Sequence, residues 1–244
     1  MINTDIRVSD LMTCAIANML LDGETVFHGV SSHLPMTAMT LAKSTHAPNL
    51  VHLNIPGGVN PSSIQHASYS SAGADLLATG EAYFPLDQVF DLSMRGKLDV
   101  AFLGGIQFDI NGNINASVIG DYHKPKVRLP GGAGSAVLIP TAKKAIIWRT
   151  KHDIRTFVEK VDFITTRGNL WRIITPLCIF EFRNGKLHLE SIHPTSSLEE
   201  VKANTGFELI YDEIKYTSLP TKQQLAILKK IDPNDYRSIE FTNE

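Results

Sequence analysis

Apolar residues along the chain follow two alternating patterns, one typical of helices and one typical of buried strands. Near the N-terminus, the apolar positions from Leu11 to Leu20 recur at helical spacing after Ser9 or Asp10, either of which can cap a helix. Short continuous apolar runs, typical of buried strands, follow between further helical patterns. Strands are predicted at residues 24–30, 50–55, 98–105 and 145–148, and helices at residues 10–19, 36–44, 86–96 and 221–230. The alternation predicts an α/β fold with an open, mainly parallel sheet and helices on both faces.

Turn signals complete this outline. Two Asn-Gly pairs, Asn111-Gly112 and Asn184-Gly185, mark predicted hairpin turns. The segment 62–84 is polar, rich in small residues and weakly periodic, so surface loops are predicted there. The chain contains no linker, repeat or low-complexity segment, and we therefore expect residues 1–244 to form a single domain.

Composition and charge narrow the class of protein. Hydrophobic residues make up 43% of the 244 residues and charged residues 20%, as in soluble globular proteins. The net charge of −2 comes with Lys and Arg spread along the chain, so we expect no nucleic-acid partner. No segment reaches the ~18 apolar residues of a membrane span, and the N-terminus lacks a signal-peptide pattern. A cytoplasmic protein without a membrane partner is predicted.

The segment "NLVHLNIPGGVNP", residues 49–61, is a candidate site because a buried strand runs directly into a loop. In α/β proteins, the loops at the carboxyl ends of strands commonly bind ligands and carry reacting groups. The corner consists of Asn54, Ile55, Pro56, Gly57 and Gly58. None of these residues has an acidic, thiol or amine side chain, so the corner offers no obvious nucleophile.

Histidine and cysteine add few candidates. The nine histidines and two cysteines show no metal-ligand spacing, and no metal site is predicted. Cys14 and Cys178 lie in apolar contexts, which predicts buried thiols. His28 and His52 lie on predicted strands in the half of the chain that contains the corner, so they are candidates to orient a ligand or pass a proton.

The glycine cluster "LPGGAGSA", residues 129–136, is a second candidate site. It matches neither the P-loop nor the dinucleotide-binding pattern. Glycines let backbone N–H groups approach a ligand, and a helix that begins near Ser135 would direct N–H groups at an anion or a developing oxyanion. The candidate donors are the backbone of Gly131, Gly132, Ala133 and Gly134 and the hydroxyl of Ser135. A plain tight turn between a strand and a helix is the alternative.

Four stretches, in this order, carry a family resemblance. They are "FLGGIQFDINGNIN", "KVRLPGGAGSA", "FITTRGNL" and "CIFEFRNGKLHLESIHPTSSLEEVKANTGFELIYDE". Together they resemble the β subunits of class I coenzyme A transferases, among them that of glutaconate CoA-transferase. The resemblance covers nearly the whole chain. It is specific in the Gln-x-Asp-x-x-Gly-Asn core, from Gln107 to Asn113, and in the segment from His193 to Phe207.

The resemblance implies an open α/β fold of the CoA-transferase type, an α-subunit partner in a heterodimer or heterotetramer, and an interface site for acyl-CoA thioesters. CoA would be part of the substrate, with no permanently bound cofactor. Gln107 and Asn113 are implied either to contact the ligand or to hold the predicted hairpin. In true transferases, a glutamate at the end of the corresponding strand attacks the thioester. Alignment through Ala47-Pro48 and Gly57 puts that glutamate on Ile55.

The missing glutamate changes the expected chemistry, because isoleucine cannot form a covalent intermediate with an acyl group. Family members that lack the glutamate decarboxylate a methylglutaconyl-type CoA ester or open a steroid-derived ring by hydrolysis. Both reactions develop negative charge next to the thioester carbonyl. We favour decarboxylation because Ile55 supplies apolar surface, while Asn54, His28 and His52 can orient a carboxylate or pass a proton. Hydrolysis would require a general base for water.

Three alternatives remain open. The chain can be a genuine CoA-transferase whose nucleophile lies elsewhere, such as Glu81. It can be a catalytically silent subunit that stabilises or regulates an active α chain. It can also be a lone sugar-phosphate-binding module of the same broad architecture.

Overall fold

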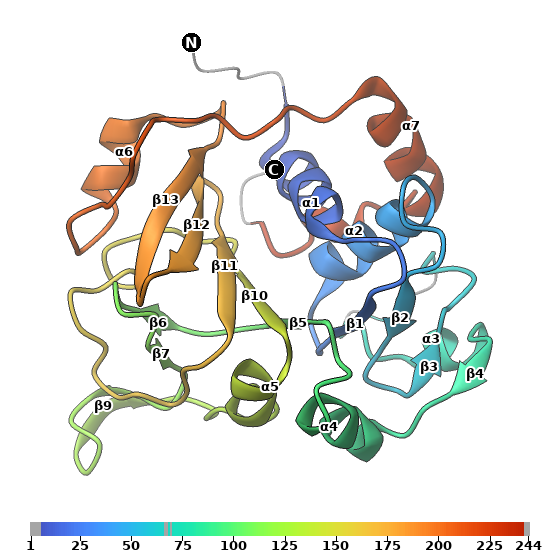
Figure 1. Cartoon of the computed structure of the whole chain (residues 1–244), viewed down its shortest axis with the longest axis horizontal. Coiled ribbons are helices and arrows are strands. Elements are labelled where there is room, and N and C mark those ends of the chain that lie inside the picture. The colour runs from blue at the N-terminus through green and yellow to red at the C-terminus, as the bar shows by residue number, and fades with distance from the viewer. Residues whose placement is uncertain (1–5, 66–67, 69, 242–244) are drawn as a thin grey trace. The chain divides into compact units, whose positions relative to one another are not determined.

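The computed structural model describes residues 6–65, 68 and 70–241, and the chain divides into two compact units. The terminal unit combines the residues up to Phe102 with those from Ser218 onward, and the central unit covers Leu103–Thr217. In Figure 1 the terminal unit runs from blue through cyan to the green of α4 and resumes in red, and the central unit runs from green to orange. A single domain over residues 1–244 stays a prediction.

The terminal unit is built on a parallel sheet that an antiparallel edge extends. Its strand order is β5-β1-β2-β3-β4, in which β1 is parallel to both β2 and β5. The strands are β1 (Thr25–His28), β2 (Val51–Leu53), β3 (Gly58–Val59), β4 (Ala82–Tyr83) and β5 (Val100–Leu103). β3 turns back antiparallel to β2, and β4 pairs antiparallel with β3. The predicted strand at residues 50–55 therefore ends early, because the chain turns after Leu53.

Helices bury the apolar faces of this sheet. They are α1 (Val8–Met19), α2 (His33–Lys43), α3 (Ala74–Ala78), α4 (Leu86–Met94), α7 (Lys222–Ile231) and the 3₁₀ helix η1 (Tyr236–Ser238). Figure 1 shows α1, α2 and α7 together on one side of β1 and β2, and α4 on the other. Leu11, Met12 and Ile16 of α1 are fully buried, as their helical spacing predicts. Pro35 lies in the first turn of α2, where its missing N–H costs no hydrogen bond.

The central unit continues with a mixed sheet. β10 (Lys144–Trp148) is parallel to β11 (Leu170–Ile174), and β12 (Cys178–Arg183) and β13 (Lys186–Ile192) follow antiparallel. Two small ladders pair β6 (Gln107–Phe108) with β7 (Ile114–Asn115), and β8 (Val118–Gly120) with β9 (Pro125–Arg128). The helices are α5 (Ser135–Thr141) and α6 (Leu198–Ala203). Both Asn-Gly pairs form the predicted turns, between β6 and β7 and between β12 and β13.

The core of the central unit is aromatic. The ring of Phe157 lies 5.6 Å from that of Phe108, 5.4 Å from that of Phe180 and 4.2 Å from the imidazole of His152, between ring centroids. Both nitrogens of His152 contact threonine hydroxyls, and burial lowers its pKa to about 3. Cys178 is buried nearby, as is Cys14 in the terminal unit, so the two predicted buried thiols are confirmed. No helix in the described part of the chain is long and apolar enough to span a bilayer.

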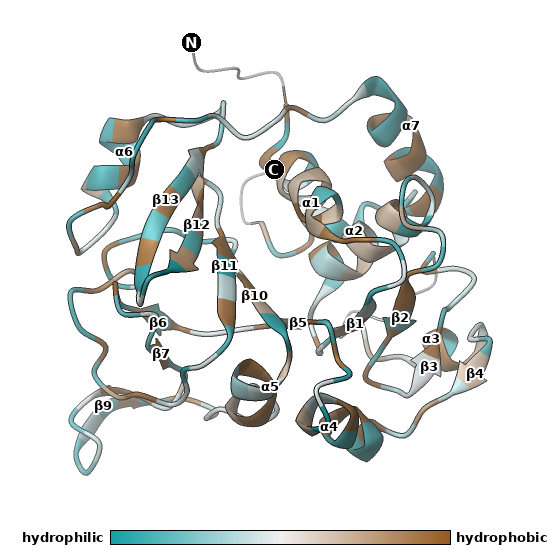
Figure 2. Ribbon diagram, viewed as in Figure 1, coloured by the Kyte–Doolittle hydropathy of each residue, from teal (hydrophilic) through white to brown (hydrophobic). Residues whose placement is uncertain are grey.

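A buried ion-pair network ties the end of the terminal unit to its first helix. Arg237 is 5% exposed, and its guanidinium lies 2.7 Å from Asp10 of α1, 2.8 Å from Asp232 and 2.9 Å from Asp235. Arg7 bridges Asp10 and Asp235 from the other side. Hydropathy colouring in Figure 2 shows polar and apolar residues alternating along α7, which precedes this segment. A buried charge survives only when it is paired, so the segment after α7 depends on these acids.

Replacing Arg237 with methionine should therefore destabilise the protein by about 3–5 kcal/mol, because it leaves buried carboxylates without their cation. The free energy of unfolding in urea measures the loss. Arg155→Met is the matched control, because Arg155 is 83% exposed and lies 3.5 Å from Asp153, a geometry that contributes less than about 1 kcal/mol. Equal losses in the two variants would contradict a structural role for the network.

Candidate functional site

Asn54 closes the corner that follows β2. Its Oδ1 accepts a hydrogen bond from the Gly58 N–H at 2.8 Å, and its backbone N–H donates to the Gly58 carbonyl at 3.3 Å. The Gly57 N–H also donates to the Asn54 carbonyl at 3.1 Å. Asn54 is 1% exposed, and its Nδ2 has no partner among the described residues. The corner thus holds a rigid, buried N–H donor to which no described residue offers an acceptor.

The two glycines of the corner permit close packing. Gly57 has a φ of +97°, a conformation that residues with side chains rarely adopt. A Cβ built on Gly57 would lie 2.7 Å from Cε2 of Tyr83 and 2.8 Å from the Phe84 carbonyl oxygen. A Cβ on Gly58 would overlap the Leu76 carbonyl oxygen. Both positions therefore require glycine, and the half-buried Ile55 and Pro56 form the outer part of the turn.

His28 and His52 lie on the same face of the sheet as Asn54. Val26 is the register partner of His52, so His28 lies two residues further along the adjacent strand. The two imidazole centroids are 5.0 Å apart, with the rings at 65°. His28 is 0% exposed and His52 1%, and the Nε2 atoms of both have no partner in the described part of the chain.

Burial sets the charge of this pair. It lowers the pKa of His28 to about 4, and it holds the pKa of His52 well below its usual range, helped by the neighbouring His28. The Nδ1 of His28 lies 3.0 Å from the Gly29 carbonyl, so a neutral ring that donates there leaves Nε2 as an acceptor. Both histidines are therefore neutral at pH 7 and have no surface through which they can exchange protons with solvent.

Glu81 lies directly before β4 and away from the end of β2, where Ile55 lies. Its carboxylate accepts a hydrogen bond from Asn60 Nδ2 at 2.9 Å, and its N–H donates to the Val59 carbonyl. Asn60 in turn pairs through its backbone and side chain with His52, before the strand reaches Ile55. The exposed Glu81 therefore does not share the strand end at which Ile55 lies.

The glycine loop belongs to the central unit. The Gly131 N–H donates to the Ala116 carbonyl at 2.8 Å, and α5 begins at Ser135, as predicted. Ala133 has a φ of +42°, which is strained for a residue with a side chain. The N–H groups of Gly132, Ala133 and Gly134 have no hydrogen-bond acceptor among the described residues. The loop therefore presents consecutive free backbone donors.

Gln107 and Asn113 hold the β6–β7 hairpin. Gln107 accepts hydrogen bonds from Asn115 Nδ2 at 2.7 Å and from the Asp162 N–H at 3.2 Å. Asn113 Nδ2 donates to Asp109 at 3.0 Å. Asp109, the acid of the Gln-x-Asp-x-x-Gly-Asn core, is 1% exposed and organises this turn through its carboxylate.

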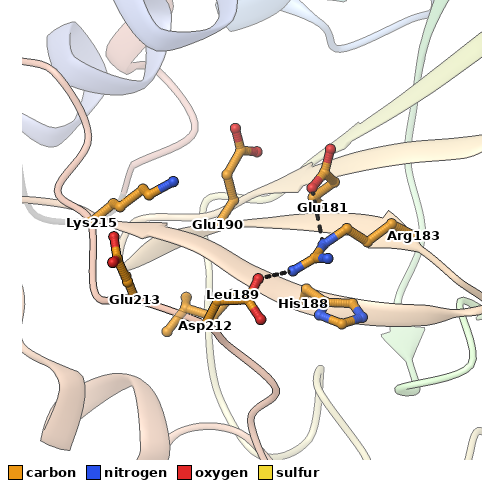
Figure 3. Close-up of a pocket in the computed structure, with 8 residues that line it drawn as sticks. All are labelled: Glu181, Arg183, His188, Leu189, Glu190, Asp212, Glu213 and Lys215. Carbon is orange, nitrogen blue, oxygen red and sulfur yellow. Dashed lines mark hydrogen bonds and ion pairs between the residues drawn. The ribbon is translucent and has the colours of Figure 1, made fainter.

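A charged hollow of about 270 Å³ lies elsewhere in the central unit (Figure 3). Its lining residues are Glu181, Arg183, His188, Leu189, Glu190, Asp212, Glu213 and Lys215. Arg183 pairs with Asp212 at 2.5 Å and with Glu181 at 3.4 Å, which Figure 3 shows as dashed lines. None of the residues selected from the sequence lines this hollow. No group of three or more metal-ligating side chains occurs within residues 6–65, 68 and 70–241.

These features define an α/β protein with a strand-end corner and a glycine loop of backbone donors. The family model for coenzyme A transferase matches residues 10–204, and the chain belongs to this family. It is 35% identical to the β subunit of 3-oxoadipate CoA-transferase from Pseudomonas knackmussii, over 92% of each chain. It is 27% identical to the β subunit of glutaconate CoA-transferase from Acidaminococcus fermentans, over 94% of each.

Solved structures show the same fold. The decarboxylase AibA/AibB matches with a TM-score of 0.90 and 30% identity, covering 96% of this chain and 98% of that one. Glutaconate CoA-transferase of Acidaminococcus fermentans matches with a TM-score of 0.86 and 24% identity, over 99% of both chains. The predicted family and the mostly parallel α/β fold are confirmed.

Because His28 is buried as a neutral ring, the free energy of unfolding should decrease as the pH is lowered. A lowered pKa in the folded state means that only the unfolded chain gains a proton between pH 6.5 and about 4, so His28 contributes a loss of up to about 3 kcal/mol across that window. Urea unfolding at a series of pH values measures the slope. His28→Gln should flatten the slope, whereas His46→Gln at an exposed position should leave it unchanged. An unaltered slope in His28→Gln would contradict burial of the neutral ring.

Proposed function

We propose that this chain is the β subunit of a heteromeric enzyme that decarboxylates an acyl-CoA thioester through an enolate. The observation that carries the proposal is the corner itself, where Ile55 and Pro56 supply apolar surface beside the unpartnered Nδ2 of Asn54. The 30% identity to the decarboxylase AibA/AibB supports it.

The chemistry follows from these groups. Loss of CO2 leaves an electron pair that passes to the thioester oxygen, so the site must stabilise an oxyanion and keep the carboxylate weakly solvated. Asn54 Nδ2 is a fixed donor, held by Gly58. Taken by themselves, the free N–H groups from Gly132 to Gly134 in the central unit are candidate donors to an anionic group of the CoA ester. Ser135 begins the helix behind them and is a candidate hydroxyl donor.

His28 and His52 have a positioning role in this proposal. They lie on the Asn54 face of the sheet but are sealed from solvent, so they cannot recycle a proton at each turnover. Neutral imidazoles behind Asn54 keep the inner side of the corner polar. They add no positive charge that would bind the carboxylate.

A partner subunit completes the proposed enzyme. The two CoA-transferase relatives are β subunits, and the decarboxylase carries two component names. We infer an α subunit of the same family, in a heterodimer or heterotetramer. CoA enters as part of the substrate thioester.

CoA transfer is the second candidate, because the chain is 35% identical to a CoA-transferase β subunit over 92% of its length. It requires a nucleophile, and the exposed Glu81, directly before β4, is the candidate acid. Hydrolysis is the third outcome, and it requires a base from the partner.

The test is to co-express this chain with an α subunit and to incubate the complex with glutaconyl-type CoA esters, with and without acetate. Mass spectrometry follows CO2, free CoA and acetyl-CoA. We expect CO2 with the thioester preserved, independent of acetate. Free CoA without CO2 would assign hydrolysis, and acetyl-CoA formed only with acetate would assign transfer.

Ile55→Glu sharpens the test. A carboxylate at this strand end should attack the thioester, so acetate-dependent acetyl-CoA should appear while CO2 release falls at least about 10-fold. Ile55→Gln is the control, because it adds a polar side chain of the same length without a nucleophile. Acetyl-CoA from the glutamine variant would show that the acid at residue 55 is not responsible.

A further inference from the structure

Decarboxylation leaves a carbanion equivalent that must take up a proton, and the corner has no obvious acid to supply one. This inference rests on the proposed function. Asn54 is an amide, and Ile55, Pro56 and the two glycines carry no ionisable group. His28 and His52 are neutral and fully buried. A donor on this chain has to be a side chain that touches the corner from another element and reaches solvent.

Tyr83 meets both requirements. It is the register partner of Gly58 in the β3–β4 ladder, and the next residue, Phe84, donates its N–H to the Gly57 carbonyl at 2.6 Å. A Cβ built on Gly57 would lie 2.7 Å from Cε2 of Tyr83 and 3.1 Å from its Cδ2. The edge of the ring that leads to the hydroxyl therefore lies directly against the turn.

The hydroxyl of Tyr83 is available for chemistry. The residue is 64% exposed, on the last strand of the sheet, and the hydroxyl makes no hydrogen bond to any described residue. Glu81, two residues earlier, is engaged by Asn60 Nδ2. An aromatic ring that merely covers glycines in a sheet needs no hydroxyl, and phenylalanine would serve equally well.

We propose that Tyr83 is the catalytic proton donor at the corner. The bond between carbon and the departing carboxylate breaks, CO2 leaves, and the electron pair enters an enolate. The Tyr83 O–H bond then breaks, its proton goes to carbon as the enolate electrons form the C–H bond, and the phenolate recovers a proton from water. A phenol suits this step because its O–H group can donate a proton to carbon.

Tyr83→Phe in the αβ complex tests the assignment, because it removes one oxygen and keeps the ring against Gly57. We expect kcat for product formation to fall about 100-fold with KM changed less than about twofold. Tyr216→Phe is the matched control at a 59% exposed tyrosine of the central unit, and it should retain wild-type kcat. The melting temperature of both variants should equal that of the wild type.

Isotope labelling gives a second readout. In D2O the wild-type complex should place deuterium at one carbon of the product, whereas Tyr83→Phe should distribute it between the carbons that share the enolate charge, because protonation then comes from unpositioned water. A Tyr83→Phe complex with wild-type kcat and labelling, in an enzyme that releases CO2, overturns the role of Tyr83 alone. A wild-type complex that releases no CO2 overturns the proposed function and the role of Tyr83 together.

Discussion

The hydrogen bond from the Gly58 N–H to Asn54 Oδ1 is the constraint on which the candidate site depends. It captures the amide oxygen and turns the chain back on itself directly after β2. The same bond fixes the direction of the Nδ2 group, which is left buried and without a partner among the described residues. A donor that is held in advance loses no free energy in reorganising when negative charge develops beside it. The turn and the proposed chemistry are thus two results of one contact.

The elements with strong periodicity could be predicted from the sequence, and the contacts that shape the site could not. The helical spacing from Leu11 to Leu20 and the Asn184-Gly185 turn are local signals, and the structure has both elements. The pair β3 and β4 has only two residues in each strand, so no periodic pattern exists to be detected. These strands form because Gly57 and Gly58 allow Tyr83 and Leu76 to approach. Close approach between distant residues is a tertiary property that single-sequence patterns do not contain.

The same limit explains the errors at the corner. The apolar run that predicted a strand through residue 55 is real, but the side chain of Asn54 competes with the strand for the Gly58 N–H and ends it. Likewise, His28 and His52 could be chosen as candidates because they lie on predicted strands. The sequence does not indicate that both imidazoles are buried and neutral. In the glycine loop, the positions of the glycines predicted backbone donors, whereas the strain at Ala133 became visible only in the backbone angles.

The terminal unit is made from both ends of a chain whose middle forms the central unit. During synthesis, α1 leaves the ribosome long before Arg237, and the whole central unit is made between them. Asp10 therefore has Arg7 beside it from the start, but its second cation, Arg237, is added only after more than half of the chain. The central unit can fold first as a continuous segment. The terminal unit is complete only after the segment from Ser218 emerges from the ribosome.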